Sequence, residues 1–215
     1  LVYTEGVKGS SPLLPTKTKI IFIIRMKLKK IKKNYNRYGL VNFLKTIFKK
    51  FNINLNILDS IQKKRSYLSK EVEAIYNDTI VEGPYKGTRL IKSDKYFLAK
   101  SAQILGCYEE EVQNEIKYLK KKINFKNLIN LGAGEGYHSV GCLNSKIIEY
   151  SVSFEMIKKN CETIEKNFLE NNLKNNFVIL SKAEKNFLNL IPKTVKLNES
   201  LFLFDIEGDE FKILD

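Results

Sequence analysis

Three alternating glycines, Gly132, Gly134 and Gly136, follow an apolar run directly and precede a helical pattern. A short apolar run that ends at glycine is typical of a buried parallel strand. Glycine at such a point lets the backbone turn tightly and approach a ligand closely. The stretch therefore predicts the first strand-to-helix turn of a nucleotide-binding α/β fold.

The glycine spacing and two acidic residues restrict the ligand. A dinucleotide loop needs its third glycine one position later, where this chain has Tyr137, so a nicotinamide oxidoreductase is disfavoured. Glu135 lies inside the loop, where a carboxylate repels phosphate but tolerates an amino-acid end such as the methionine part of S-adenosylmethionine. Glu155 follows Gly136 by nineteen residues, close to the spacing of about 20 at which an acid meets ribose hydroxyls. Loop and acid together predict a site for an adenosine that carries an amino acid.

A second pair of acids follows the last expected strand. Asp205 ends the apolar run 201–205, and Glu207 comes two residues later. Ligands in open α/β sheets bind beyond the carboxyl ends of the strands. Asp205 or Glu207 is therefore expected either to orient an acceptor hydroxyl and take its proton, or to hydrogen-bond loop backbone. His138 is the only histidine, which excludes a multi-histidine metal site, and we expect it to be packed or solvated.

These motifs resemble those of a known family. The glycine loop 132–136 with Glu155 is similar to motif I and the following acidic site of class I S-adenosylmethionine-dependent methyltransferases. The run 204–211, Phe-Asp-Ile-Glu-Gly-Asp-Glu-Phe, is similar to the Asp-Val-Glu-Gly-x-Glu element of FkbM-like methyltransferases. Residues 82–87 and 105–109 resemble segments that precede motif I in that group. The resemblance implies methyl transfer to a hydroxyl of a sugar or of a small or conjugated metabolite.

The resemblance also implies roles around the cofactor. The loop backbone lines the methionine part, with Asn130 or Glu135 near the ammonium, although many superfamily members have an acid at the position of Asn130. Glu155 accepts both ribose hydroxyls. No metal is needed. The implied cofactor-binding residues are Asn130, Gly132, Ala133, Gly134, Glu135, Gly136, Phe154, Glu155, Met156, Ala183 and Glu184.

Most of these residues have a second interpretation. The glycine turn is otherwise shaped for packing alone, and Glu155 is otherwise a solvated carboxylate at a strand end. Phe154 and Met156 either sandwich the adenine or belong to the core. Ala183 and Glu184 either contact the adenine edge or begin a solvated helix. Two other functions also stay open: an RNA or protein methyltransferase that uses the basic N-terminal segment, and a non-catalytic remnant that binds cofactor weakly or only self-associates.

The positive charge is confined to the N-terminal part. The chain has a net charge of +13, and twelve of its 37 basic residues lie between Lys17 and Lys50, a stretch without any acid. Residues 26–51 have apolar positions every three or four residues, which predicts a basic amphipathic helix. Such a helix either docks on the domain or contacts an anionic membrane through residues 27–51, and a nucleic-acid partner is disfavoured. Three cysteines without a Cys-x-x-Cys pair favour a reducing cytoplasm.

Four regions are expected along the chain. Residues 1–25 form a disordered or non-native leader, 26–78 a basic helical segment, 79–124 a hairpin and helices that cover the cofactor site, and 125–215 an incomplete Rossmann-like domain. Within 26–124 we expect helices at 60–76, 94–105 and 108–122 and a hairpin at 79–91. A chain of 215 residues suits one domain with an appendage.

The last region alternates strands and helices. We expect strands at 126–131, 146–154, 177–180 and 201–205, and helices at 136–143, 156–170 and 184–190. Repeated β-α units imply a doubly wound parallel sheet, here of order three-two-one-four. Residues 209–214 read as the start of a further helix, so we expect a C-terminally truncated chain whose fourth strand has an unpaired edge.

Overall fold

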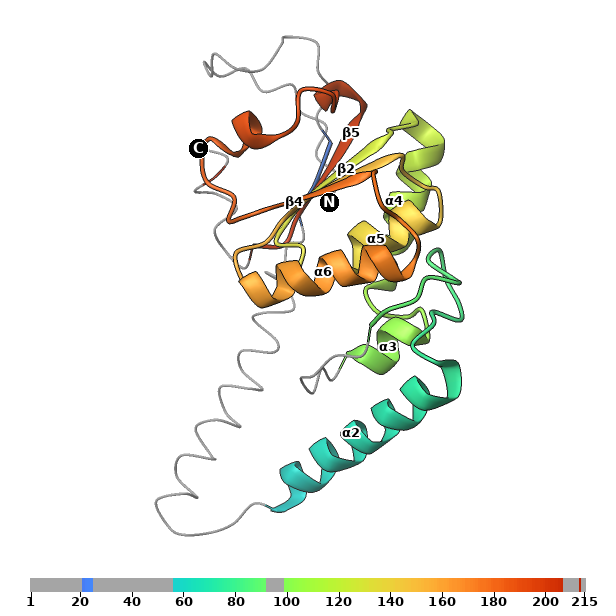
Figure 1. Ribbon diagram of the computed structural model, residues 1–215. Coiled ribbons are helices and arrows are strands. Elements are labelled where there is room, and N and C mark those ends of the chain that lie inside the picture. Colours follow the sequence, from blue (N-terminus) through green and yellow to red (C-terminus); the bar gives the residue numbers. More distant parts are fainter. Residues whose placement is uncertain (1–20, 25–55, 92–98, 207–212, 214–215) are drawn as a thin grey trace.

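The computed structural model describes residues 21–24, 56–91, 99–206 and 213. In this part of the chain, five short strands form one parallel sheet flanked by helices (Figure 1). The order of the strands is β1-β5-β2-β3-β4. They are β1 (Ile21–Ile24), β2 (Asn127–Leu131), β3 (Tyr150–Phe154), β4 (Phe177–Leu180) and β5 (Ser200–Phe204).

The first to fourth predicted strands are β2, β3, β4 and β5. Their spatial order in the sheet, β4-β3-β2-β5, confirms the predicted Rossmann-like order three-two-one-four. The crossover helices are α5 (Tyr137–Asn144), between β2 and β3, and α6 (Lys158–Glu170), between β3 and β4. Most predicted bounds shift by a few residues, and two elements of the sheet domain differ more clearly. β3 begins four residues later than expected, since Lys146 adopts a left-handed backbone with φ of 57°. The predicted helix 184–190 is a 3₁₀ turn, η1 (Phe187–Leu190), and a second 3₁₀ turn, η2 (Leu197–Glu199), precedes β5.

The edge of β5 that the sequence analysis leaves unpaired is occupied by β1. Ile21 pairs with Leu201 and Ile24 with Phe204 in parallel register. β1 lies inside segment 1–25, for which no regular structure is predicted. Its sequence, Ile-Phe-Ile-Ile, consists of residue types that favour strands, and pairing satisfies backbone groups that an edge exposes.

Apolar side chains cover both faces of the sheet. Successive strand residues point to opposite faces, so Leu128 and Leu203 pack on one face with α4, α5 and α6. Phe154 and Phe202 pack on the other face with Phe187 of η1. Because the glycine loop and Glu155 follow β2 and β3 directly, the two packed layers fix the strand ends that carry the site.

Among the described residues, three helices precede the sheet domain: α2 (Asn56–Tyr76), α3 (Lys100–Ile104) and α4 (Glu110–Ile123). α2 extends away from the sheet (Figure 1). We call residues 79–91 and 99–109 the cover. The predicted hairpin at 79–91 is a loop closed by one antiparallel bridge, Thr79 to Arg89, because the turns at Gly83 and Gly87 have positive φ.

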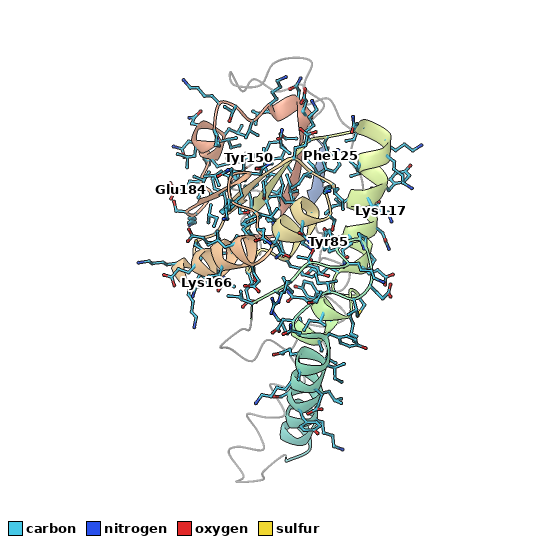
Figure 2. The ribbon with its side chains drawn as sticks, turned by 45° about the vertical axis from the view of Figure 1, so that its right-hand side comes forward. Tyr85, Lys117, Phe125, Tyr150, Lys166 and Glu184 are labelled. Carbon is cyan, nitrogen blue, oxygen red and sulfur yellow. The ribbon has the colours of Figure 1, made fainter. Side chains whose placement is uncertain are left out.

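The cover docks on α5 through Tyr85. This side chain is fully buried and its ring makes an edge contact with Tyr137, the two centroids lying 5.3 Å apart. Gly141 of α5 faces the same ring, and a Cβ there would lie 2.5 Å from Cγ of Tyr85. Figure 2 shows Tyr85 beside α5. The absence of a side chain at Gly141 is therefore what admits the ring.

Gly141→Ala is expected to lower the free energy of unfolding by about 1–2 kcal/mol, because overpacking a core costs about 1–3 kcal/mol and the buried ring puts this site at the upper end. The gain in helix propensity, about 1 kcal/mol, does not offset the displacement of a ring that is buried on all sides. Thermal unfolding measures the change, and Glu165→Ala on the exposed face of α6 serves as control. An unchanged melting temperature would show that Tyr85 is not held against this helix.

Several predictions fall on residues outside the described part: the helix at 26–51 with its membrane contact at 27–51, the helix 94–105 before residue 99, most of the helix start at 209–214, and the acid Glu207. None of the helices in the described part has the length and apolar character that crossing a bilayer requires. Of the predicted helix 94–105, only the part from residue 99 onward is described, and it contains α3.

Candidate functional site

The glycine loop turns at the carboxyl end of β2. The backbone N–H groups of Gly132 and Ala133 donate to the carbonyl oxygen of Phe154 at 2.9 and 3.0 Å, which ties the loop to β3. Gly136 closes the turn by donating to Ala133 at 2.9 Å. Gly132, Gly134 and Gly136 all have positive φ, a conformation in which glycine carries no steric cost. The loop is therefore a compact turn whose backbone lies against the neighbouring strand.

Glu155 lies beside this loop. Its Oε2 accepts the backbone N–H of Gly134 at 2.8 Å, and its Oε1 accepts that of Ile157 at 2.8 Å. The residue is buried, with 6% of its surface exposed. A carboxylate has about four acceptor positions, so each oxygen keeps one position beyond its backbone bond. The sequence-predicted glycine loop and acid are thus brought together at one point.

A small polar network lies behind the loop. Asn130 and Ser153 are opposite each other on β2 and β3. Ser139 of α5 accepts from Asn130 Nδ2 at 3.1 Å and from Ser153 Oγ at 2.9 Å. Asn130 Oδ1 is buried and has no hydrogen-bond partner among the described residues. A buried acceptor without a donor is costly unless a ligand or water supplies one.

The two aromatic and apolar candidates beside Glu155 differ in exposure. Phe154 is 1% exposed and packs edge-on against Phe187 at 5.7 Å, so it belongs to the core rather than to an adenine sandwich. Met156 is 71% exposed. The end of the strand explains the difference, because Phe154 is the last residue of β3 and packs in the core, whereas the chain has left the strand before Met156.

The two candidate cofactor-binding residues after β4, Ala183 and Glu184, also differ in exposure. Ala183 is buried in the same core as Phe154, whereas Glu184 is exposed. Neither begins a regular α-helix, since the next element is the 3₁₀ turn η1. Only Glu184 therefore retains a surface that a ligand can reach directly.

Asp205 follows β5 directly beside the glycine loop. Its backbone N–H donates to Leu131 at 2.9 Å, and its carbonyl oxygen lies against Gly132. The residue is partly exposed. The structure therefore brings Asp205, one of the two acids predicted on the acceptor side, to the same sheet end as the glycine loop, while Glu207 lies outside the described residues.

A buried network joins the cover to α5 next to the loop. Nδ1 of His138 lies 3.0 Å from Tyr85 Oη, and Nε2 lies 3.0 Å from Glu109 Oε2. Cys142 Sγ donates to Tyr85 Oη at 3.3 Å. Burial raises the pKa of Tyr85 well above its ordinary value and raises the pKa of Cys142 to about 12, so both groups are neutral at physiological pH. His138 is thus a packed residue with two polar partners, and packing is one of the two environments expected for it from the sequence.

Solved structures share parts of this fold. A protein from Staphylococcus aureus assigned as a caffeoyl-CoA O-methyltransferase matches at 18% identity and a TM-score of 0.35, over 39% of this chain and 40% of its own. An enzyme described as precorrin 8w decarboxylase from Methanobacterium thermoautotrophicum matches at 13% identity and a TM-score of 0.37, over 47% and 53%. A protein from Pyrococcus horikoshii assigned as an RNA methyltransferase matches at 19% identity and a TM-score of 0.33, over 55% and 53%. Two of these three are assigned as methyltransferases.

These likenesses concern the fold alone. The chain spans between 40% and 53% of the length of those three structures. No protein-family model and no curated protein matches the sequence. The functional argument therefore rests on the residues of the site.

Sequence reasoning missed the polar contacts that the site makes with its neighbours. Ser139, Ser153 and the α6 residue Asn167 are all buried and hydrogen-bonded near the loop. The signal for Ser153 was present, because Ser151 and Ser153 alternate with Val152 and Phe154 along a buried strand. Asn167 has no comparable local signal, since its partners lie 32 and 76 residues away.

Proposed function

We propose that this protein is an S-adenosylmethionine-dependent methyltransferase of the FkbM-like type that O-methylates a hydroxyl of a sugar or of a small or conjugated metabolite. The observation that carries the proposal is the position of Glu155, whose carboxylate lies against the glycine loop with acceptor capacity to spare. An acid at this place, one strand from a glycine turn, is suited to the two hydroxyls of a ribose.

The residues fit this cofactor. Glu155 uses one acceptor position of each oxygen for a backbone N–H, and the second position of each matches one ribose hydroxyl. Asn130 contributes a buried acceptor without a donor two residues before Gly132. Glu135 provides a negative charge in the loop itself. An acceptor and a carboxylate near the loop suit an ammonium group and oppose a phosphate.

The apolar surface next to Glu155 fits an adenine ring. Met156 and Ile157 are 71% and 48% exposed and follow the acid directly. A thioether makes favourable contacts with aromatic rings. The chain thus offers an acceptor for ribose and an apolar contact for the base in successive residues.

S-adenosylmethionine supplies an activated methyl group, so the protein has to hold the acceptor hydroxyl in line and exclude water. We assign the role of orienting that hydroxyl or taking its proton to Asp205, whose backbone lies beside the loop, with Glu207 as the alternative. The similarity of residues 204–211 to the FkbM-like element supports this choice of acceptor chemistry.

Isothermal titration of the full-length protein with S-adenosylhomocysteine tests the cofactor assignment. Binding with one site per chain is expected, and NADH is expected not to bind. Methyl transfer from labelled S-adenosylmethionine to sugars, glycoconjugates, RNA and protein then identifies the acceptor class. Absence of S-adenosylhomocysteine binding would overturn the proposal, and labelling of RNA alone, with a steep dependence on salt, would replace the proposed acceptor.

A further inference from the structure

One buried side chain connects the cover to the glycine loop. Asn167 on α6 is 2% exposed. Its Oδ1 accepts the backbone N–H of Ile91 in the cover at 2.6 Å, and its Nδ2 donates to the backbone carbonyl of Glu135 in the loop at 2.9 Å. The carboxamide is therefore used from both ends, once as acceptor and once as donor.

The contact on the loop side holds a peptide group that shapes the loop. The carbonyl of Glu135 is bonded to Asn167, and the N–H of the same peptide, from Gly136, donates to Ala133 at 2.9 Å. Because a peptide group is planar, bonds at both of its ends fix its orientation. This peptide leads into α5, so its orientation sets the path of the loop.

The contact on the cover side is equally well defined. The carbonyl of Ile91 accepts from Lys100 Nζ at 2.8 Å, so both backbone groups of Ile91 are held by side chains. Lys100 is 2% exposed, and burial lowers its pKa despite the opposing effects of Asp78 and Glu135. Losing either bond would leave a polar group without its partner inside the molecule.

The residue one helical turn later makes a comparable pair of bonds that does not reach the loop. Asn171 Oδ1 accepts the N–H of Arg89 at 2.8 Å, and its Nδ2 donates to the carbonyl of the same residue at 2.7 Å. Both asparagines thus anchor residues 89–91 to α6. Asn171 bonds the cover and, through Nδ2, the backbone carbonyl of Asn167 at 2.7 Å, whereas the Asn167 side chain bonds the cover and the loop.

We propose that Asn167 is a positioning residue that couples the cover to the glycine loop and holds the loop in the shape that receives the amino-acid part of the cofactor. The second half of this inference rests on the proposed function. An asparagine is required because the site needs one donor and one acceptor in a short side chain. An aspartate of the same size keeps the acceptor for Ile91 but faces the carbonyl of Glu135 with a negative charge.

Asn167→Asp and the matched control Asn171→Asp separate anchoring of the cover from shaping of the loop. We expect Asn167→Asp to weaken binding of S-adenosylhomocysteine at least tenfold while the affinity for adenosine, which lacks the amino acid, changes less than twofold. Asn171→Asp is expected to change both affinities less than twofold. Equal losses for the two ligands, or equal losses in the two variants, would overturn the inference.

Hydrogen exchange in the absence of cofactor tests the coupling without relying on the proposed function. Amides of residues 133–138 should exchange faster in Asn167→Asp and not in Asn171→Asp, while amides of the cover should exchange faster in both. If the wild-type protein binds neither ligand, the proposed function fails, and the exchange data still decide whether cover and loop are coupled. Should Asn167→Asp not fold, Asn167→Ala removes both bonds without adding charge and is measured in the same way.

Discussion

Glu155→Gln is expected to lower the affinity for S-adenosylhomocysteine about 10- to 100-fold, since one lost hydrogen bond to a charged group is worth about 1.5–3 kcal/mol. The amide nitrogen of glutamine donates and does not accept. The variant therefore has one acceptor position fewer for a ribose hydroxyl. Its amide nitrogen also lies against the backbone N–H of Gly134 or Ile157, which accepts no hydrogen bond from it and loses its own acceptor. Isothermal titration measures the affinity.

Glu165→Gln is the control for this change, because it removes the same charge from an exposed position on α6. Thermal unfolding of both variants separates binding from folding: the unsatisfied buried donor in Glu155→Gln is expected to cost about 1–3 kcal/mol of stability. Full affinity in a folded Glu155→Gln protein would remove the main support for the adenosine site.

Gly132→Ala is expected to lower the free energy of unfolding by about 3–5 kcal/mol, which combines overpacking with backbone strain. The residue has φ of 81°, and an added Cβ would overlap the carbonyl oxygen of Asp205. Both groups belong to strand ends that are held by the sheet, so neither moves away cheaply. Because the overlap separates the loop from Asp205, cofactor binding should also be lost. Denaturant unfolding measures the first effect and titration the second.

Gly134→Ala provides the matched control two residues further on. Gly134 also has positive φ, but an added Cβ there meets no atom within 4 Å. We expect this variant to lose only about 1 kcal/mol, the cost of placing alanine in the left-handed region. Similar losses in the two variants would show that the approach of Gly132 to Asp205 does not contribute to stability.

Much of the sheet could be predicted from local pattern. The apolar runs at β2, β4 and β5 and the glycine turn after β2 are each readable within about ten residues, and the repeated β-α units imply the parallel order. The beginning of β3 could not be read, because residues 146–149 contain strand-forming types whose course is decided by the turn at Lys146. The pairing of β1 with β5 joins segments about 180 residues apart in the chain, a distance over which local pattern carries no information.

In the candidate site, too, some features follow from the local sequence and others depend on long-range packing. The proximity of Glu155 to the glycine loop follows from their places after neighbouring parallel strands. The sequence does not tell whether Phe154 and Met156 belong to the core or lie at the surface. The structure buries Phe154 in the core and leaves Met156 exposed. The partners of His138, Tyr85 and Glu109, both lie in the cover, so these contacts depend on how the cover docks on α5.

The sequence by itself determined the α/β class, the strand order of the Rossmann-like sheet and the identity of the loop and acid that face each other. These features depend on residue type and spacing within single strands and turns. Only the tertiary structure decided which edge β1 covers, which candidates are buried, and that Asn167 joins the cover to the loop. Such contacts are made between residues far apart in the chain, and they exist only once the packed layers bring those residues within hydrogen-bonding distance.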